Sequence, residues 1–354
     1  MSQKNKSYFV AFDDEYGWGN TTYFSFFSEF NRSWNDLPYI EAFVLIFLFL
    51  FSILGNCIVF YQIMKLRSTR TVTNYLIGNL AVADILFSTG SPLIAVARMT
   101  GTWVLGSFVC KMLVYEMFIC ASVMIWTMTI ISVDRYICIL KTDWKKITPI
   151  VAICSIVILW ILDFIAFIPL AMYFNVKNFT FGNTEITLCT LLWPTNQSVR
   201  LSMLFTATVC IIGFVIPLGI LAFSYFRILR KFWKTRHAVG SAVKSIKCRE
   251  ERDFRLIKNL ILMVLLFLVM WLPIFVMMAL IQADGMADDM AIPSYALIAA
   301  VCVALGNACV NPFLYGIVNG RVKRGILRSV LSQKKKFRIS TIDSKTDNSR
   351  VGHT

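Results

Sequence analysis

Long runs of apolar residues dominate the chain, and short polar segments separate them. An α-helix needs about 20 residues to cross the hydrocarbon core of a bilayer, so an apolar run of that length predicts a membrane span. Such runs lie near residues 40–63, 75–97, 108–133, 148–172, 200–224, 256–281 and 291–318. The pattern therefore predicts an all-α membrane protein built as a seven-transmembrane helix bundle.

The composition supports this class, because 57% of the 354 residues are hydrophobic and only 16% are charged. The net charge of +15 would suggest a nucleic-acid partner in a soluble protein. Here the charge follows the membrane pattern instead, so we expect membrane lipids around the chain and no nucleic acid. The two histidines, His237 and His353, lie in segments expected to be cytoplasmic, and no set of nucleophile and base is visible, so we expect no enzyme activity.

Basic residues gather in the segments that follow the first, third, fifth and seventh spans. The segment from Arg227 to Arg252, expected to be a loop after the fifth span, is the most basic of these, whereas the first 36 residues carry several acids. The positive-inside rule then predicts an extracellular N-terminus and a cytoplasmic C-terminus in the plasma membrane. No stretch at the start is typical of a cleaved signal peptide.

The same orientation divides the chain into four parts. These are an extracellular tail (1–36), the bundle (37–318), a basic amphipathic juxtamembrane helix (319–332) and a disordered cytoplasmic tail (333–354). The sequons for N-glycosylation all fall on the predicted outer side, at Asn5, Asn20, Asn31, Asn178 and Asn196.

Ten cysteines are present, and most of them lie within predicted spans. Cys248 falls in the predicted cytoplasmic loop, which leaves Cys110 and Cys189 as the two on the outer side. We therefore expect these two to form a disulfide.

Polar residues inside spans are expensive and tend to mark function. Asn56, Asp84, Asn307 and Asn311 lie at depths where the first, second and seventh helices could share one polar network, with Tyr315 close by. Each of them could also form an ordinary hydrogen bond between helices. Prolines interrupt five spans, at Pro92, Pro169, Pro217, Pro273 and Pro312, and predict helix kinks.

At the predicted cytoplasmic end of the third span, Asp134 and Arg135 precede Tyr136. Asp253, before the sixth span, offers Arg135 a second carboxylate. An arginine held between two acids near the membrane boundary forms an ion pair that a cytoplasmic partner could break.

Together these motifs resemble those of the rhodopsin-like, class A G-protein-coupled receptors. The resemblance covers roughly residues 40–332 and is carried by Asn56, Asp84, Asp134-Arg135-Tyr136, Trp160, Pro217, Tyr225, Trp271-x-Pro273 and Asn311-Pro312-x-x-Tyr315. It implies an activation switch that includes Ile125, Pro217 and Phe267, a toggle at Trp271, and a heterotrimeric G protein, with arrestin and a receptor kinase, as partners. It also implies an allosteric Na⁺ site at Asp84, although Met124 stands where many members have a serine ligand, and Met270 replaces the usual cysteine before Trp271.

Within this class the chain resembles the long-chain free fatty acid receptors, in "NTTYFSFFSEF", "SPLIAVARMTGTWVLG", "EITLCTLLWPT" and "RDFRLIKNLILMVLLFLVMWLPI". The resemblance implies that Arg98 holds a lipid carboxylate and that Trp103, Met117, Phe118 and Trp271 lie in the pocket. Phe205 and Phe275 are expected to complete an apolar chamber below Arg98. The aliphatic "YALIAAVC" at the start of the seventh helix departs from the aromatic pattern of these receptors.

Three alternatives stay open at this point. Arg98 could extend to the membrane interface without binding a ligand. A peptide receptor of the same fold would use acids such as Glu116, Asp284, Asp288 and Asp289 in its outer cavity. A transporter is a remote alternative, because neither internal repeats nor a charged path through the membrane is visible.

Overall fold

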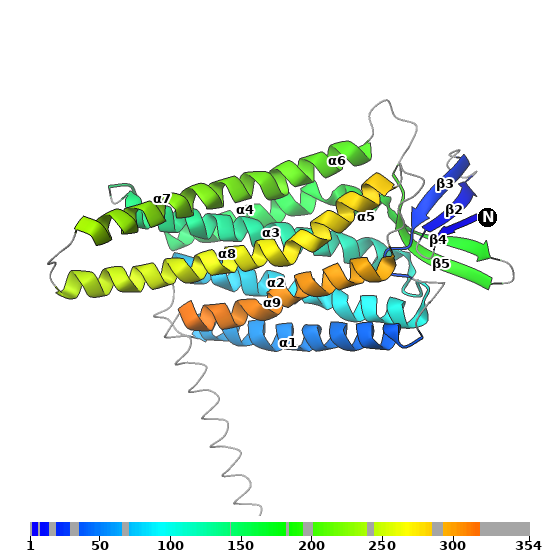
Figure 1. Ribbon diagram of the computed structural model, residues 1–354, viewed down its shortest axis with the longest axis horizontal. Coiled ribbons are helices and arrows are strands. Elements are labelled where there is room, and N and C mark those ends of the chain that lie inside the picture. Colours follow the sequence, from blue (N-terminus) through cyan, green and yellow to red (C-terminus); the bar gives the residue numbers. More distant parts are fainter. Residues whose placement is uncertain are drawn as a thin grey trace, which may run out of the picture.

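The computed structural model describes residues 2–5, 8–13, 19–28, 35–65, 71–141, 143–181, 184–193, 201–238, 244–284 and 293–318. Long helices lie side by side in a bundle, and the strands gather at one end, called here the strand-bearing end (Figure 1). The helices are α1 (Leu37–Lys65), α2 (Val72–Thr100), α3 (Gly106–Leu140), α4 (Pro149–Ala166), α5 (Ile168–Tyr173), α6 (Leu201–Cys210), the π-helix η2 (Ile211–Val215), α7 (Ile216–Ala238), α8 (Lys244–Asp284) and α9 (Ser294–Val318).

Within the described ranges, seven helical spans are long and apolar enough to cross a membrane. The fourth span joins α4 to α5, and the fifth joins α6, η2 and α7. The predicted seven-helix architecture is therefore confirmed. The amphipathic helix and the tail expected over 319–332 and 333–354 lie outside the described residues.

Short strands, which the hydrophobic pattern does not predict, complete the strand-bearing end. Strands β1 (Ser2–Asn5), β2 (Tyr8–Asp13) and β3 (Gly19–Phe24) form an antiparallel sheet in the order β1-β2-β3. Strands β4 (Phe174–Phe181) and β5 (Thr184–Leu191) form a hairpin. The segments are rich in aromatic and β-branched residues, which favour strands, but they are too short to stand out beside the membrane spans.

The predicted disulfide is present between Cys110 in the first turns of α3 and Cys189 in β5, with Cα atoms 5.6 Å apart. It attaches the hairpin to the bundle. Three hydrogen bonds to Thr187 hold the same hairpin. The Trp103 amide and Thr102 Oγ1 donate to the Thr187 carbonyl at 2.8 and 2.9 Å, and the Thr187 amide donates to Thr102 Oγ1 at 2.9 Å.

Two predicted spans are less regular than the sequence suggests. The fourth span breaks at Phe167, just before Pro169, which has no amide hydrogen to donate. The fifth span widens into the π-helix η2, which ends two residues before Pro217, and π-turns of this kind are frequent at functional sites.

The prediction of a loop over 227–252 is partly wrong. α7 continues to Ala238 and α8 already begins at Lys244, so most of this basic segment is helical. Lysine, arginine and glutamate are good helix formers, and the two helices extend beyond the apolar runs that predicted them.

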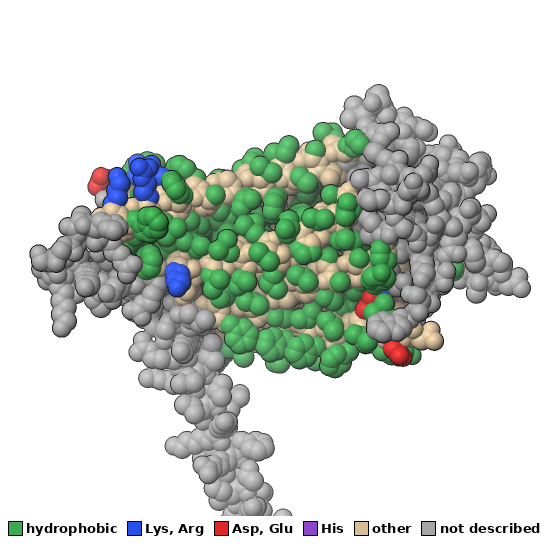
Figure 2. Space-filling model, in the orientation of Figure 1, with side chains coloured by type: hydrophobic (Ala, Val, Ile, Leu, Met, Phe, Trp, Pro, Cys, Tyr) green, Lys and Arg blue, Asp and Glu red, His purple; other side chains and the backbone are tan. Residues whose placement is uncertain are grey.

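The lateral surface of the bundle is apolar (Figure 2). On α4 only Ala152 and Asp163 are buried, and side chains such as Ile150 and Val157 are more than half exposed. Lysine and arginine side chains gather at the end opposite the strand-bearing end in the same view. This surface suits the hydrocarbon of a bilayer.

Inside the bundle, polar side chains join helices to one another. Asn79 of α2 donates from Nδ2 to Thr127 Oγ1 of α3 at 2.9 Å and accepts from Trp160 Nε1 of α4 at 2.9 Å. One amide thus connects three helices. Gly55 of α1 allows a second close approach, because a Cβ there would lie 2.8 Å from Cγ of Pro312 in α9.

We predict that Asn79→Ala destabilises the bundle, because it removes the acceptor of the Trp160 indole and the interhelical donor to the Thr127 hydroxyl. At about 0.6 kcal/mol for each interhelical hydrogen bond, the melting temperature Tm of the purified protein should fall by roughly 2–4 °C. Ser155→Ala is the control, because its hydroxyl bonds only to the Val151 carbonyl of its own helix. Equal Tm values for the two variants would contradict the role assigned to Asn79.

Candidate functional site

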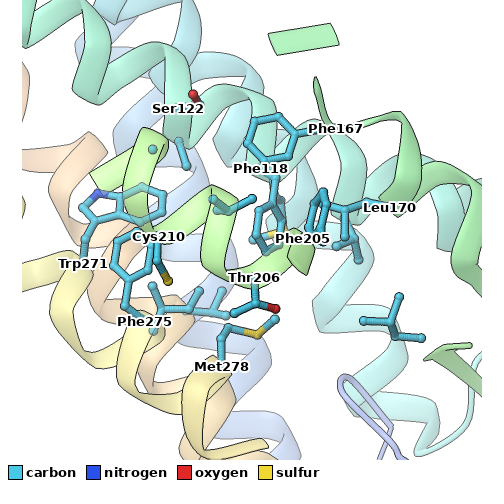
Figure 3. Close-up of a pocket in the computed structure, with 18 of the residues that line it drawn as sticks. Phe118, Ser122, Phe167, Leu170, Phe205, Thr206, Cys210, Trp271, Phe275 and Met278 are labelled. Atoms are coloured by element: carbon cyan, nitrogen blue, oxygen red, sulfur yellow. The ribbon is translucent and has the colours of Figure 1, made fainter. Parts of the chain in front are cut away.

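A cavity of about 160 Å³ opens among the helices near the strand-bearing end. The lining residues come mainly from four helical spans: Val114, Met117, Phe118, Ala121, Ser122 and Ile125 of α3; Phe205, Thr206, Val209, Cys210 and Gly213 of α6 and η2; Phe267, Trp271, Ile274, Phe275, Met278 and Ala279 of α8; and Leu297 and Val301 of α9. Figure 3 shows the aromatic rings that surround it. Among the described residues that line the cavity, none carries a charge.

The inner end of the cavity is an aromatic stack centred on Trp271. Its ring centroid lies 5.1 Å from that of Phe87 and 5.4 Å from that of Phe267, and the Phe267 ring is stacked on it. Ile125 lines the same region. A ligand that reaches this depth would press on Trp271 and Phe267, both on α8 two to six residues before Pro273.

The walls contain four of the side chains expected from the sequence. Met117, Phe118, Phe205 and Phe275 all line the cavity, with Phe118 and Phe275 on opposite sides (Figure 3). Phe167, at the end of α4, packs between Phe118 and Phe205, with ring centroids 5.8 and 6.4 Å away. The sequence did not single out Phe167, because a helical pattern does not reveal that the chain breaks there.

The roof of the cavity comes from the N-terminal tail and the hairpin. Phe26 and Phe27 line the cavity, and the Phe26 ring packs edge-on against Phe174 with centroids 5.2 Å apart. The Thr190 hydroxyl donates to the Phe24 carbonyl at 3.0 Å and fastens the tail to β5. The aromatic run "YFSFFSEF" in a tail of otherwise mixed composition was the available signal for this contact.

Arg98 lies close to this roof but does not line the cavity. The residue is 2% exposed, and its side chain makes a bidentate ion pair with Glu41 of α1, with Nε–Oε2 at 2.6 Å and Nη2–Oε1 at 3.1 Å. Its Nη1 donates to the Phe27 carbonyl at 3.4 Å. The guanidinium thus links α1, α2 and the residue whose ring covers the cavity.

Trp103 is also buried beside the roof rather than in the cavity wall. Its indole nitrogen donates to the Gly106 carbonyl at 2.9 Å, and its ring centroid lies 6.1 Å from that of Phe27. Trp103 therefore packs against Phe27, whose ring lines the cavity.

At the opposite end of the bundle, Arg135 forms an ion pair with its neighbour Asp134, which also accepts from Thr73 Oγ1 at 3.4 Å. Tyr136 packs against Phe223 of α7 with ring centroids 5.9 Å apart. Tyr225 of α7 is buried. The side chains of Asp253 and Tyr315 lie outside the described residues, so the expected second carboxylate stays a prediction.

The predicted polar network lies in the middle of the bundle. Asn311 Nδ2 of α9 donates to Asp84 Oδ2 at 2.9 Å and to Asn307 Oδ1 at 3.4 Å, and Asn56 Nδ2 of α1 donates to the Ala308 carbonyl at 2.9 Å. Within the described part of the chain, Asp84 Oδ1 and Asn311 Oδ1 are buried without a hydrogen-bond partner. Such oxygens fit a Na⁺ ion, whereas the thioether of Met124 offers it no oxygen.

Of the sequons, Asn178 is described and exposed on β4. The side chains of Asn5, Asn20, Asn31 and Asn196 lie outside the described residues, so glycosylation stays a prediction.

The comparison with known proteins decides the family. The profile of the 7 transmembrane receptor (rhodopsin family) matches residues 55–315, which cover six whole helical spans and part of the first. The chain belongs to this receptor family. Its members are receptors rather than enzymes, and they act through a ligand and a G protein. The receptor is thus a multi-pass protein of the plasma membrane.

The relatives of the receptor include both peptide and fatty acid receptors. It is 29% identical over 290 residues to neuropeptide Y receptor type 2 of mouse (Mus musculus), covering 81% of this chain and 74% of the relative. It is 30% identical over 308 residues to free fatty acid receptor 4 of rat (Rattus norvegicus), covering 84% of each chain. Sequence similarity alone therefore does not distinguish a peptide ligand from a fatty acid ligand.

We predict that Glu41→Ala destabilises the receptor strongly, because it leaves the Arg98 guanidinium buried without its carboxylate. Removal of one partner of a buried ion pair costs roughly 3–5 kcal/mol, whereas replacing both partners by apolar residues is often nearly neutral. The double variant Glu41→Leu/Arg98→Leu should therefore have a higher Tm than Glu41→Ala. A double variant that melts below the single variant would show that the pair is not the main constraint at this site.

Proposed function

We propose that this receptor binds an extracellular lipid, a long-chain free fatty acid, in the aromatic cavity and activates a heterotrimeric G protein. The observation that carries the proposal is the wall of the cavity, where aromatic rings, aliphatic side chains and Met117 and Met278 surround the space and no described lining residue is charged. An acyl chain gains free energy by leaving water for such a wall. Methionine and aromatic side chains also adapt to flexible apolar ligands.

A peptide ligand fits this wall less well. Glu116, one of the acids considered for peptide binding, does not line the cavity and instead accepts from Thr89 Oγ1 at 3.3 Å. The side chains of Asp284, Asp288 and Asp289 lie outside the described residues. A peptide would bring backbone amides and carbonyls that need partners, and burying them unpaired is unfavourable. The lipid is therefore the better match to the described cavity.

Arg98 is proposed to hold the lipid carboxylate, since a guanidinium matches a carboxylate with two parallel hydrogen bonds. Glu41 already occupies those donors, at 2.6 and 3.1 Å. The fatty acid would have to replace Glu41 or share the guanidinium with it. Arg98 lies close enough to the cavity for this step, because the carbonyl of Phe27 accepts from Arg98 and the ring of Phe27 lines the cavity.

The roof has to move for a long lipid to enter. A cavity of about 160 Å³ is smaller than the roughly 300–1,000 Å³ typical of ligand pockets. Phe26 and Phe27 occupy the space between the cavity and the strand-bearing end, and displacing them would extend the cavity toward Arg98. The ordered tail thus competes with the ligand for the outer part of the site.

Signal transmission would start at the inner end of the cavity. The acyl chain would favour a rotation of Trp271 and Phe267, and with them the part of α8 on the far side of Pro273. Release of Arg135 from its carboxylate partners, Asp134 and the predicted Asp253, would then open a groove for the G protein. The ligand shifts this equilibrium only by its difference in affinity for the two states.

The same proposal includes the membrane orientation. The strand-bearing end faces outward, with the N-terminus extracellular and the sequons available for glycans, and the C-terminal tail lies in the cytoplasm, where arrestin and a receptor kinase would act. The lysines and arginines at the opposite end of the bundle in Figure 2 support this orientation.

To test the lipid site, we compare Ala121→Phe, which fills the cavity, with Val157→Phe, which adds the same ring on the exposed face of α4. Calcium and cyclic-AMP responses are measured against a panel of long-chain fatty acids and of peptides at equal surface expression. The wild type and Val157→Phe should respond to fatty acids, and Ala121→Phe should lose at least about tenfold in potency, because the acyl chain and the ring compete for one space. A wild type that responds to a peptide and to no fatty acid would reject the proposal.

The head-group contact is tested with a fatty acid and its methyl ester. In the wild type the acid should be more potent than the ester by about tenfold or more, the effect of one charge-assisted hydrogen-bonded pair. In Arg98→Gln this preference should disappear. If Arg98→Gln weakens acid and ester by the same factor, Arg98 supports the roof and does not bind the carboxylate.

A further inference from the structure

The buried face of α4 carries one acid, Asp163, at the depth of the cavity. The residue is 6% exposed, on a helix whose other side chains are largely exposed on the lateral surface of the bundle. Asp163 Oδ1 accepts a hydrogen bond from Ser122 Oγ of α3 at 2.8 Å. Within the described part of the chain, Asp163 Oδ2 is buried and has no hydrogen-bond partner.

This pair borders the ligand cavity. Ser122 lines the cavity, and so do Phe118 and Phe167, which lie four residues from Ser122 and Asp163 on their respective helices. The Phe118–Phe167 ring contact and the Ser122–Asp163 hydrogen bond therefore form two successive rungs between α3 and α4. Figure 3 shows Ser122, Phe118 and Phe167 along one side of the cavity, across from Phe275 and Met278.

The pair has hydrogen-bond acceptor capacity left over but no free donor. The single hydroxyl hydrogen of Ser122 is directed to Asp163, so the remaining capacity of Ser122 Oγ is to accept. An ionised Asp163 also only accepts, and one of its oxygens has no donor. A half-satisfied polar pair in an apolar interior is unfavourable, and a donor brought in through the cavity would relieve it.

We propose that Ser122 and Asp163 form a polar subsite that recognises an O–H group on the hydrocarbon chain of the lipid. This inference rests on the proposed function and narrows the ligand to a long-chain lipid with a hydroxyl between its head group and its terminal methyl. The ligand hydroxyl donates to Ser122 Oγ, or to Asp163 Oδ2 after the serine rotates. A ketone or an ether at the same carbon brings no donor and gains nothing from this subsite.

The experiment measures the potency of four lipids in cells: a long-chain fatty acid, the same acid with a hydroxyl near the middle of its chain, the methyl ether of that hydroxyl, and the keto analogue with a ketone at the same carbon. A series of mid-chain positions covers the unknown depth of the subsite. The variants are Ser122→Ala and Asp163→Ala, and the control is Thr208→Ala, whose hydroxyl bonds only to the Leu204 carbonyl of α6. Surface expression and Tm are measured for each variant.

In the wild type and in Thr208→Ala, the best hydroxy acid should be about tenfold more potent than the plain acid, the size of one additional hydrogen bond, and the ether should not share this gain. In Ser122→Ala and Asp163→Ala the ratio of the two potencies should fall to near one, whatever change the potency of the plain acid itself undergoes. If Asp163→Ala is not expressed, Asp163→Asn provides the test. The asparagine amide adds N–H donors, which can bond to a ketone oxygen. Asp163→Asn should therefore reduce the potency ratio of the hydroxy acid to the plain acid and raise the potency of the keto analogue.

A hydroxy acid that is no more potent than the plain acid in the wild type would overturn the subsite and leave the proposed function intact. If Ser122→Ala and Asp163→Ala keep the preference for the hydroxy acid over the plain acid, the subsite is also overturned, and the pair serves only in helix packing. Failure of every lipid to activate or bind the wild type would reject the proposed function and this inference with it.

Discussion

A buried ion pair between Arg98 and Glu41 controls the strand-bearing end of the bundle. A charge within a membrane needs a partner, and the carboxylate of α1 provides one with two short contacts to the guanidinium of α2. The same guanidinium contacts the carbonyl of Phe27, whose ring covers the cavity. One interaction thus joins two helices and positions the roof. Any anionic ligand that approaches Arg98 has to compete with it.

The same physical rule organises the rest of the interior. Asn79 joins α2, α3 and α4, Asn311 joins α9 to Asp84 of α2, and Arg135 pairs with Asp134 at the opposite end. In a lipid environment such bonds determine which helices pack together, because apolar side chains gain little by choosing one another over lipid. The cavity lies near the strand-bearing end, in a part of the bundle where rings and aliphatic chains predominate. The polar pair of Ser122 and Asp163 at its border contrasts with that wall.

Much of this arrangement follows from the sequence. Run length predicts the seven spans, and elimination among ten cysteines predicts the Cys110–Cys189 disulfide, because both depend on local pattern and membrane side. The resemblance to the fatty acid receptors likewise implies pocket positions for Met117 and Phe118, and both line the cavity. The partner of Arg98 was not predictable in this way, because Glu41 lies near the start of another span and its contact depends on how α1 and α2 pack. The same holds for Phe26 and Phe27, which reach the cavity only after the tail has folded back over the bundle. The break at Phe167 and the helical extensions of α7 and α8 depend on backbone geometry that hydropathy does not describe.

The central claim is that an acyl chain occupies the cavity among α3, α6, α8 and α9. Photoaffinity labelling measures this directly: the purified receptor is irradiated with a long-chain fatty acid that carries a diazirine near its terminal methyl, with and without excess unlabelled acid, and the labelled residues are mapped by mass spectrometry. We expect label that the unlabelled acid displaces on the lining residues of α3 and α8, around Ala121 and Trp271. Label confined to lipid-exposed positions such as Phe43 and Phe47 of α1, and unaffected by the unlabelled acid, would contradict the account.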